Sequence, residues 1–171
     1  ENKANILRAI NRFGWLRTRD IAVLIWSKWK RPDLAAQFEV SGAIPPSQSQ
    51  LRMAQRTLKT MHSEGLLLVA DAPDGSRMYG LSAKGAQILG FKGVDAASGK
   101  DQVRPPSLGY FRHRCISNEI AIAAITAGYR VSTEREIAKG TWRWGKEGLC
   151  GKLPDVFVKA RDHFYWIEVE R

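Results

Sequence analysis

Apolar residues recur every three or four positions in the first part of the chain, and this spacing predicts helices. A first helix ends before Gly14, and a second begins at Thr18, which is expected to cap it, with Asp20 in its first turn. The apolar positions are Ile6, Leu7, Ile10 and Phe13 in the first helix and Ile21, Leu24, Ile25 and Trp29 in the second. A looser stretch with Gly and Pro follows, up to residue 50.

A third helix is predicted from Ser47 or Ser49 to Gly65, and its two sides differ in chemistry. Leu51, Ala54, Leu58 and Met61 fall on one side at about 100° per residue. The opposite side carries Gln48, Arg52, Gln55, Arg56 and Lys59. Arg and Gln side chains pair bidentately with guanine and adenine edges, although a solvated helix face is also often basic. The helix is therefore a candidate DNA reader, with a solvated surface as the alternative.

A hairpin and a short helix follow the third helix. Leu66–Ala70 predicts a strand, Asp71–Gly75 a turn and Met78–Leu81 the returning strand, and Ser82 caps a helix. This order of elements is that of a winged helix-turn-helix, in which the third helix enters the major groove of double-stranded DNA. The hairpin around Arg77 would lie on the DNA backbone. A winged helix that binds only protein is the alternative.

The second part of the chain begins after a stretch rich in Gly, Pro and Ser. The pattern predicts a DNA-binding domain over 1–90, a linker over 91–107 and a second domain over 108–171. Tyr110–Ala127 is expected to be a helix that is apolar on several sides and therefore buried. Glu119 lies at the edge of the main apolar face of this helix. It is expected to be either a structural acid paired with an Arg or a metal ligand.

Carboxylates follow at the ends of predicted strands. Tyr129–Thr133 predicts one strand, and Pro154–Lys159 and Phe164–Glu170 predict a hairpin. Between them lies a loop in which Trp142 and Trp144 either pack on the core or stack on an unpaired base. The hairpin would present Asp155, Glu168 and Glu170 together, where a divalent cation would relieve their repulsion. Oxygen ligands suit Mg²⁺ or Mn²⁺, which can promote phosphodiester cleavage.

These acidic residues carry a family resemblance. Asp155 after Pro154, followed by Glu168-Val169-Glu170, resembles the PD-(D/E)xK nuclease core. The resemblance implies a restriction-endonuclease-like α/β domain in which the acidic pair holds the metal, with Glu119 as a further ligand. Glu170 occupies the place of the catalytic lysine, so Lys159 or Arg171 would have to substitute.

A second resemblance covers most of the chain. Met78–Gly85, His113–Asn118, Pro154-Asp155 and Glu168-Val169-Glu170 are similar to the replication–relaxation family of mobile elements. That family includes the MobC relaxases of plasmid mobilisation, which resemble nucleases rather than histidine-cluster relaxases. His62, His113 and His163 are far apart in the sequence and form no His-x-His motif.

Charge and composition agree with a DNA partner. The formal charge is +10, and both parts are basic, with 13 basic against 7 acidic side chains in 1–90 and 14 against 10 in 91–171. Two cysteines without pairing or metal-like spacing indicate a cytoplasmic protein, and no apolar run suits a bilayer. The chain starts at Glu1 and ends directly after a strand-like run, so we expect an α+β protein truncated at its C-terminus.

Two functions remain open. The first is a relaxase-type endonuclease that binds a plasmid transfer origin and nicks one strand, with Asp155, Glu168, Glu170 and Lys159 at the catalytic site. The second is a non-catalytic DNA-binding regulator or relaxosome accessory protein that uses a degenerate nuclease fold for assembly. The resemblance implies relaxosome or conjugation proteins as partners, and nothing in the sequence indicates a membrane partner.

Overall fold

The computed structural model describes residues 1–28, 39, 43–104, 106–160 and 163–170. These residues form a mixed α+β fold with six helices and two small antiparallel sheets. The chain divides into two units, one made of Glu1–Ser27 and Pro45–Phe111, the other of Lys28–Ile44 and Arg112–Arg171. Arg171 itself lies outside the described residues.

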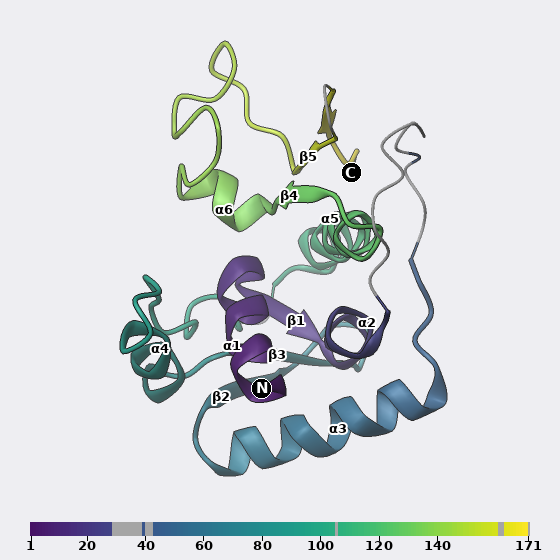
Figure 1. The fold of residues 1–171 in the computed structure, drawn as a ribbon, viewed down its shortest axis with the longest axis vertical. Helices are drawn as coiled ribbons and strands as arrows, with labels where there is room; N and C mark the ends of the chain where they lie inside the picture. Colours follow the sequence, from purple (N-terminus) through teal and green to yellow (C-terminus); the bar gives the residue numbers. More distant parts are fainter. Residues whose placement is uncertain (29–38, 40–42, 105, 161–162, 171) are drawn as a thin grey trace. The chain divides into compact units, whose positions relative to one another are not determined.

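The first unit contains four helices and a three-stranded sheet. Its elements in chain order are α1 (Asn2–Phe13), β1 (Trp15–Arg17), α2 (Thr18–Trp26), α3 (Gln48–Ser63), β2 (Leu67–Asp71), β3 (Arg77–Leu81) and α4 (Ala83–Gly90). α1 packs against α2 and α4, and α2 packs against α3. In Figure 1, α3 is the long helix along the outer side of this unit. The four helices predicted in this half are confirmed, although α2 ends at Trp26, and Trp29, which was assigned to it, lies outside the described residues.

The apolar spacing explains which helix faces are buried. Ile6, Leu7, Ile10 and Phe13 of α1 are buried, and the helix ends at Gly14 with a positive φ of 85°. In α3 the buried residues are Ala54, Leu58 and Met61, on the predicted side. α2 begins at Thr18 itself, so its N-cap is Arg17 rather than Thr18. The reason is that the Asp20 carboxylate accepts the Arg17 backbone N–H at 2.9 Å.

The sheet of the first unit has the order β1-β3-β2, with both pairs antiparallel. The hairpin β2–β3 pairs Leu67 with Leu81 and Asp71 with Arg77. The third strand, β1, is a three-residue segment that the sequence did not predict. It is too short to show an alternating pattern, and all of its residues are buried.

The segment 91–107, expected to be a linker, makes hydrogen bonds within the first unit. Gly99 donates its backbone N–H to Leu81 at 2.8 Å, and Asn11 donates its side-chain amide to the Asp95 carbonyl at 3.0 Å. Val103 is buried close to Gly80, where any Cβ would meet its side chain. The boundary between the units follows Phe111.

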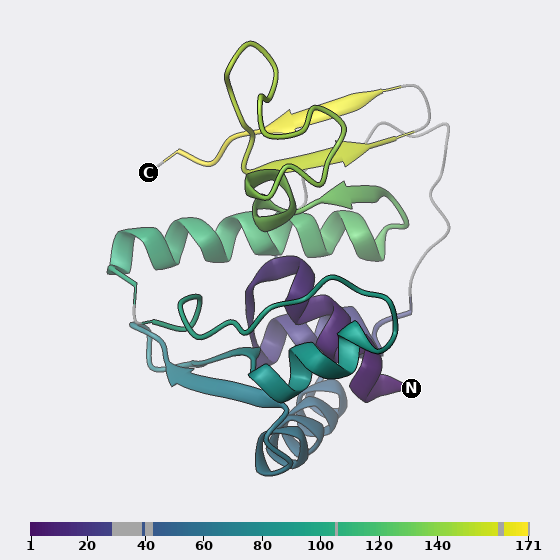
Figure 2. The same cartoon turned by 90° about the vertical axis from the view of Figure 1, so that its left-hand side faces the viewer.

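The second unit contains a long helix, a short helix and three strands. α5 (Leu108–Thr126) belongs to it from Arg112 onward, followed by β4 (Arg130–Ser132), α6 (Glu134–Ala138), β5 (Val156–Lys159) and β6 (Phe164–Ile167). The strand order is β4-β5-β6, antiparallel throughout. Figure 2 shows the three strands side by side above α5. β6 ends at Ile167, which is earlier than predicted.

Aromatic side chains from the loop after α6 pack on this sheet. Trp142 is buried with Ile137 and Phe157, and Trp144 and Trp166 pack against this group. The expectation that Trp142 and Trp144 are packing residues is confirmed. The centroids of these two rings are 5.2 Å apart in an edge-to-face arrangement.

Candidate functional site

The polar side of α3 is exposed along its whole length. The side chains predicted to contact DNA there are all exposed, namely those of Gln48, Arg52, Gln55, Arg56 and Lys59. Arg77, at the start of β3, is exposed as well. The structure therefore leaves each predicted DNA-contacting side chain of α3 and the hairpin accessible to a partner.

A groove in the first unit joins α3 to the hairpin. It is open, has a volume of about 870 Å³ and is lined by Gln55 and Lys59 of α3 and by Arg77 of β3. His62 and Asp71 also line it. The sequence placed Lys59 and Arg77 on separate elements, and the fold brings them to one groove. His62 was not predicted for this surface, although its position three residues after Lys59 places it on the same helix face.

The start of α3 is fixed to the end of α2. Ser47 accepts the Gln50 backbone N–H at 3.3 Å, and Gln50 in turn accepts the Ser47 N–H at 2.7 Å, which is a capping box. The Gln50 amide nitrogen also donates to the Trp26 carbonyl and the Ser27 hydroxyl, at 3.1 and 3.2 Å. These bonds hold α3 in a defined orientation against α2.

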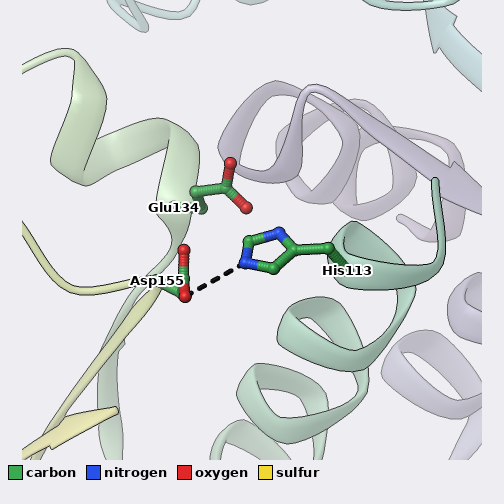
Figure 3. A group of neighbouring side chains, drawn as sticks. All are labelled: His113, Glu134 and Asp155. Carbon is green, nitrogen blue, oxygen red and sulfur yellow. Dashed lines mark ion pairs between the residues drawn. The ribbon is translucent and has the colours of Figure 1, made fainter. Parts of the chain in front are cut away.

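In the second unit, three side chains from separate elements meet at one point. His113 comes from the N-terminal part of α5, Glu134 is the first residue of α6, and Asp155 directly precedes β5. One ligand atom of each lies within 4.8 Å of the others. The imidazole Nε2 of His113 lies 3.1 Å from Asp155 Oδ2, and Figure 3 shows both carboxylates beside the imidazole ring.

The surroundings of the cluster fix its members. The backbone N–H of Val169 donates to Asp155 Oδ2 at 2.8 Å, and Arg114 Nη1 lies 2.9 Å from Glu134 Oε2. Beside it, burial and the positive charge of Arg114 lower the pKa of Arg135. Arg114 thus offsets the charge of the Glu134 carboxylate in the cluster.

The donor set and one orphaned atom fit a metal ion. His113 is only 8% exposed, and its Nδ1 has no hydrogen-bond partner among the described residues, although buried polar atoms are normally paired. Imidazole nitrogen suits transition metals, whereas carboxylate oxygen also suits Mg²⁺ and Mn²⁺. One nitrogen and two carboxylate ligands therefore favour Mn²⁺ or a similar transition metal over Mg²⁺.

The predicted carboxylate site is only partly reproduced. Asp155 belongs to the cluster, but Glu168, Glu170 and Glu119 belong to no group of three potential ligands in the described part of the chain. Glu168 is exposed and accepts the Trp166 indole N–H at 2.8 Å, and Glu170 is exposed beyond the end of β6. Glu119 is half-buried in α5.

The two residues considered as substitutes for the catalytic lysine do not complete this cluster. Lys159 lies at the far end of β5 from Asp155, with its ammonium 5.8 Å from the centroid of Phe164. Arg171 lies outside the described residues. The cation that contacts the cluster is Arg114, through its ion pair with Glu134.

The sequence analysis did not single out Glu134, and it named His113 only within the segment His113–Asn118 and as one of three histidines that are far apart in the sequence. A signal for Glu134 was present, because Thr133-x-x-Glu136 is a capping-box sequence that begins a helix. The Thr133 hydroxyl accepts the Glu136 N–H at 3.3 Å, and Glu136 accepts the Thr133 N–H at 2.9 Å. This start of α6 fixes the position of Glu134.

Comparisons with known proteins identify no relative: no protein-family model matches the chain, and neither do curated proteins or solved structures. Among the helices that the structure describes, none combines the length and the apolar character needed to cross a membrane.

Proposed function

We propose that the first unit of this protein is a winged helix and that the protein binds double-stranded DNA through it. The element order of α1, β1, α2, α3, the hairpin β2–β3 and α4 supports the proposal. α3 is the reading helix, and the hairpin contacts the phosphate backbone. The observation that carries the proposal is the exposed Arg and Gln side of α3, opposite a buried apolar side.

The groove between α3 and the hairpin supports the same orientation. Lys59 and Arg77 line it from two elements, so a phosphate strand that follows the groove would meet two cations. Asp71, which pairs with Arg77 across the hairpin, also lines the groove and would lower the attraction of phosphate to Arg77. The side chains nearer the start of α3, Arg52 and Arg56, are then those that face base edges.

A gel-shift or anisotropy titration with duplex DNA tests this proposal. Arg52→Ala together with Arg56→Ala should weaken binding by roughly 1–3 kcal/mol for each residue that reads a base. The matched control is Arg8→Ala with Lys92→Ala, which removes two exposed charges elsewhere in the same unit. Equal affinities of the two double variants would contradict a specific role for α3.

We further propose that the second unit nicks one DNA strand, as in a relaxase-type endonuclease acting at a plasmid transfer origin. Asp155, His113 and Glu134 would hold the divalent metal, and Asp155 is the residue common to this cluster and the nuclease resemblance. A divalent metal held by these three residues would supply the chemistry that phosphodiester cleavage needs, namely activation of water and stabilisation of the leaving oxygen. Restriction-endonuclease-like packing of the second unit, with relaxosome proteins as partners, belongs to the same proposal.

The ligand set can be tested by substitution. We expect Mn²⁺ to raise the melting temperature, because a ligand that binds only the folded state stabilises it by mass action. His113→Ala and Asp155→Ala should remove this rise and any conversion of supercoiled DNA to relaxed circles. Glu170→Ala is the matched control and should retain both. If only Glu170→Ala lost the rise in melting temperature and the nicking, the result would favour the metal site predicted from the sequence.

A non-catalytic DNA-binding regulator or relaxosome accessory protein is the second candidate function. The exposed position of Glu168 and its hydrogen bond with Trp166 favour it, because this carboxylate is engaged away from the cluster. Duplex binding without stabilisation by Mn²⁺ and without nicking would select this function.

A further inference from the structure

One face of the β4–β6 sheet carries a basic and aromatic hollow outside the metal cluster. It has a volume of about 280 Å³. Its lining includes Arg130, Ser132, Arg143, Phe157, Lys159 and Phe164. The proposed DNA contacts of α3 and the proposed metal ligands use none of these side chains, except that Lys159 was considered for the nuclease site.

The strand register explains why these side chains gather. Arg130 pairs with Lys159, and Lys159 pairs with Phe164, so the three form one row across the sheet. Ser132, Phe157 and Trp166 form the next row. Paired residues on antiparallel strands point to the same face, and residues two apart along a strand share it. The two rows therefore lie on one face of the sheet. The first row carries two cations and one aromatic ring, and the second row carries two aromatic rings.

The ring of Phe164 is partly open to a ligand. It is 40% exposed, although a phenyl side chain gains free energy from burial. It stacks on the buried ring of Phe157, with centroids 5.6 Å apart and an interplanar angle of 17°. The Arg143 guanidinium lies 4.6 Å from its centroid. Phe157 thus holds Phe164 in place, and a planar group could stack beside it or exchange with the guanidinium.

The described residues that line the hollow carry only positive charge. Arg130, Arg143 and Lys159 are exposed, and none of the three makes an ion pair with a described residue. No carboxylate among the described residues lines the hollow. Such unneutralised cations next to an aromatic ring match a ligand that alternates phosphates with planar bases.

We propose that this hollow binds single-stranded DNA. In a duplex the bases are stacked and paired, so Phe164 could not reach the face of one, whereas an unpaired base can stack on it. Lys159, next to Phe164 in the row, and Arg130 beyond it would contact successive phosphates on one side of that base. The choice of DNA over RNA rests on the proposed function, since nicking and local opening of an origin expose a single strand.

The test is fluorescence anisotropy of a labelled oligothymidylate of about eight residues, with the whole chain, over a series of salt concentrations. Phe164→Ala should weaken binding about tenfold, the effect of losing one stacked base. Arg130→Gln and Lys159→Gln should each lower the slope of log K against log salt by about 0.7, the value for one single-strand phosphate contact. These two exposed side chains keep the test valid if Phe164→Ala fails to fold.

The controls separate this proposal from the function proposed above. Lys152→Ala removes an exposed charge of the same unit outside the hollow and should bind like the parent chain. Arg52→Ala with Arg56→Ala should weaken binding of duplex DNA and leave binding of the oligothymidylate unchanged. The hollow variants should weaken binding of the oligothymidylate and leave binding of duplex DNA unchanged. Parental affinity in all three hollow variants would overturn the proposal. Tighter hollow-dependent binding of an oligouridylate would overturn the assignment to DNA.

Discussion

Replacing Gly85 by Ala is expected to destabilise the first unit, although alanine favours helices. A Cβ at Gly85, in α4, would collide with the carbonyl oxygen of Leu66 and would lie 3.3 Å from Leu7 Cδ2. The Leu66 carbonyl cannot withdraw freely, because it accepts the Ser82 N–H at 3.2 Å. The Ser82 hydroxyl also donates to the Gly65 carbonyl at 2.6 Å. α4 must therefore move away from the start of the hairpin to make room.

The expected magnitude follows from two opposing effects. Overpacking costs about 1–3 kcal/mol, and a backbone obstacle places this case at the upper end. The gain in helix propensity from Gly to Ala is about 1 kcal/mol, so the net loss is about 2 kcal/mol. For a unit of this size each kcal/mol shifts the melting temperature by about 4–8 °C.

Gly90, at the end of the same helix, provides the matched control. A Cβ there would meet nothing within 4 Å, so Gly90→Ala should be neutral or stabilise by up to about 1 kcal/mol. Thermal unfolding followed by circular dichroism measures both variants. A Gly85→Ala protein that melts with the parent would refute the close packing of α4 on the hairpin.

Three further changes address the first unit. Asp20→Ala should lower the free energy of unfolding by about 3–5 kcal/mol in a urea titration, because it leaves the buried guanidinium of Arg17 without the carboxylate 3.0 Å away. Gln50→Ala should weaken duplex binding with only a modest change in melting temperature, since it releases the start of α3 from the end of α2. For Asp74, desolvation raises the pKa, but the two hydrogen bonds from Ser76, the positive charge of Arg17 and a backbone hydrogen bond together outweigh it, and the pKa is lowered from 3.8. Its contribution to stability is therefore present above about pH 3.8 and lost as the pH falls through the lowered value, so Asp74→Ala and the parent should converge in melting temperature at acidic pH.

Much of the first unit could be predicted from the sequence because its signals are local. The spacing of Ile6, Leu7 and Ile10 identifies the buried face of α1, and Gly14 ends the helix. The same applies to α3, where Ser47 caps the helix and the polar side is exposed as predicted. Each of these signals lies within a few turns of one helix, so no knowledge of distant contacts is needed.

The candidate metal cluster, in contrast, was decided by tertiary structure. His113, Glu134 and Asp155 come from α5, α6 and the start of β5, and only the folding of these elements brings them within 4.8 Å. Strand alternation predicted Glu168 as the neighbour of Asp155, but β6 ends at Ile167, and Asp155 accepts the Val169 backbone N–H instead. Alternation fixes the face of a side chain only while the strand continues, and where a strand ends depends on its partner.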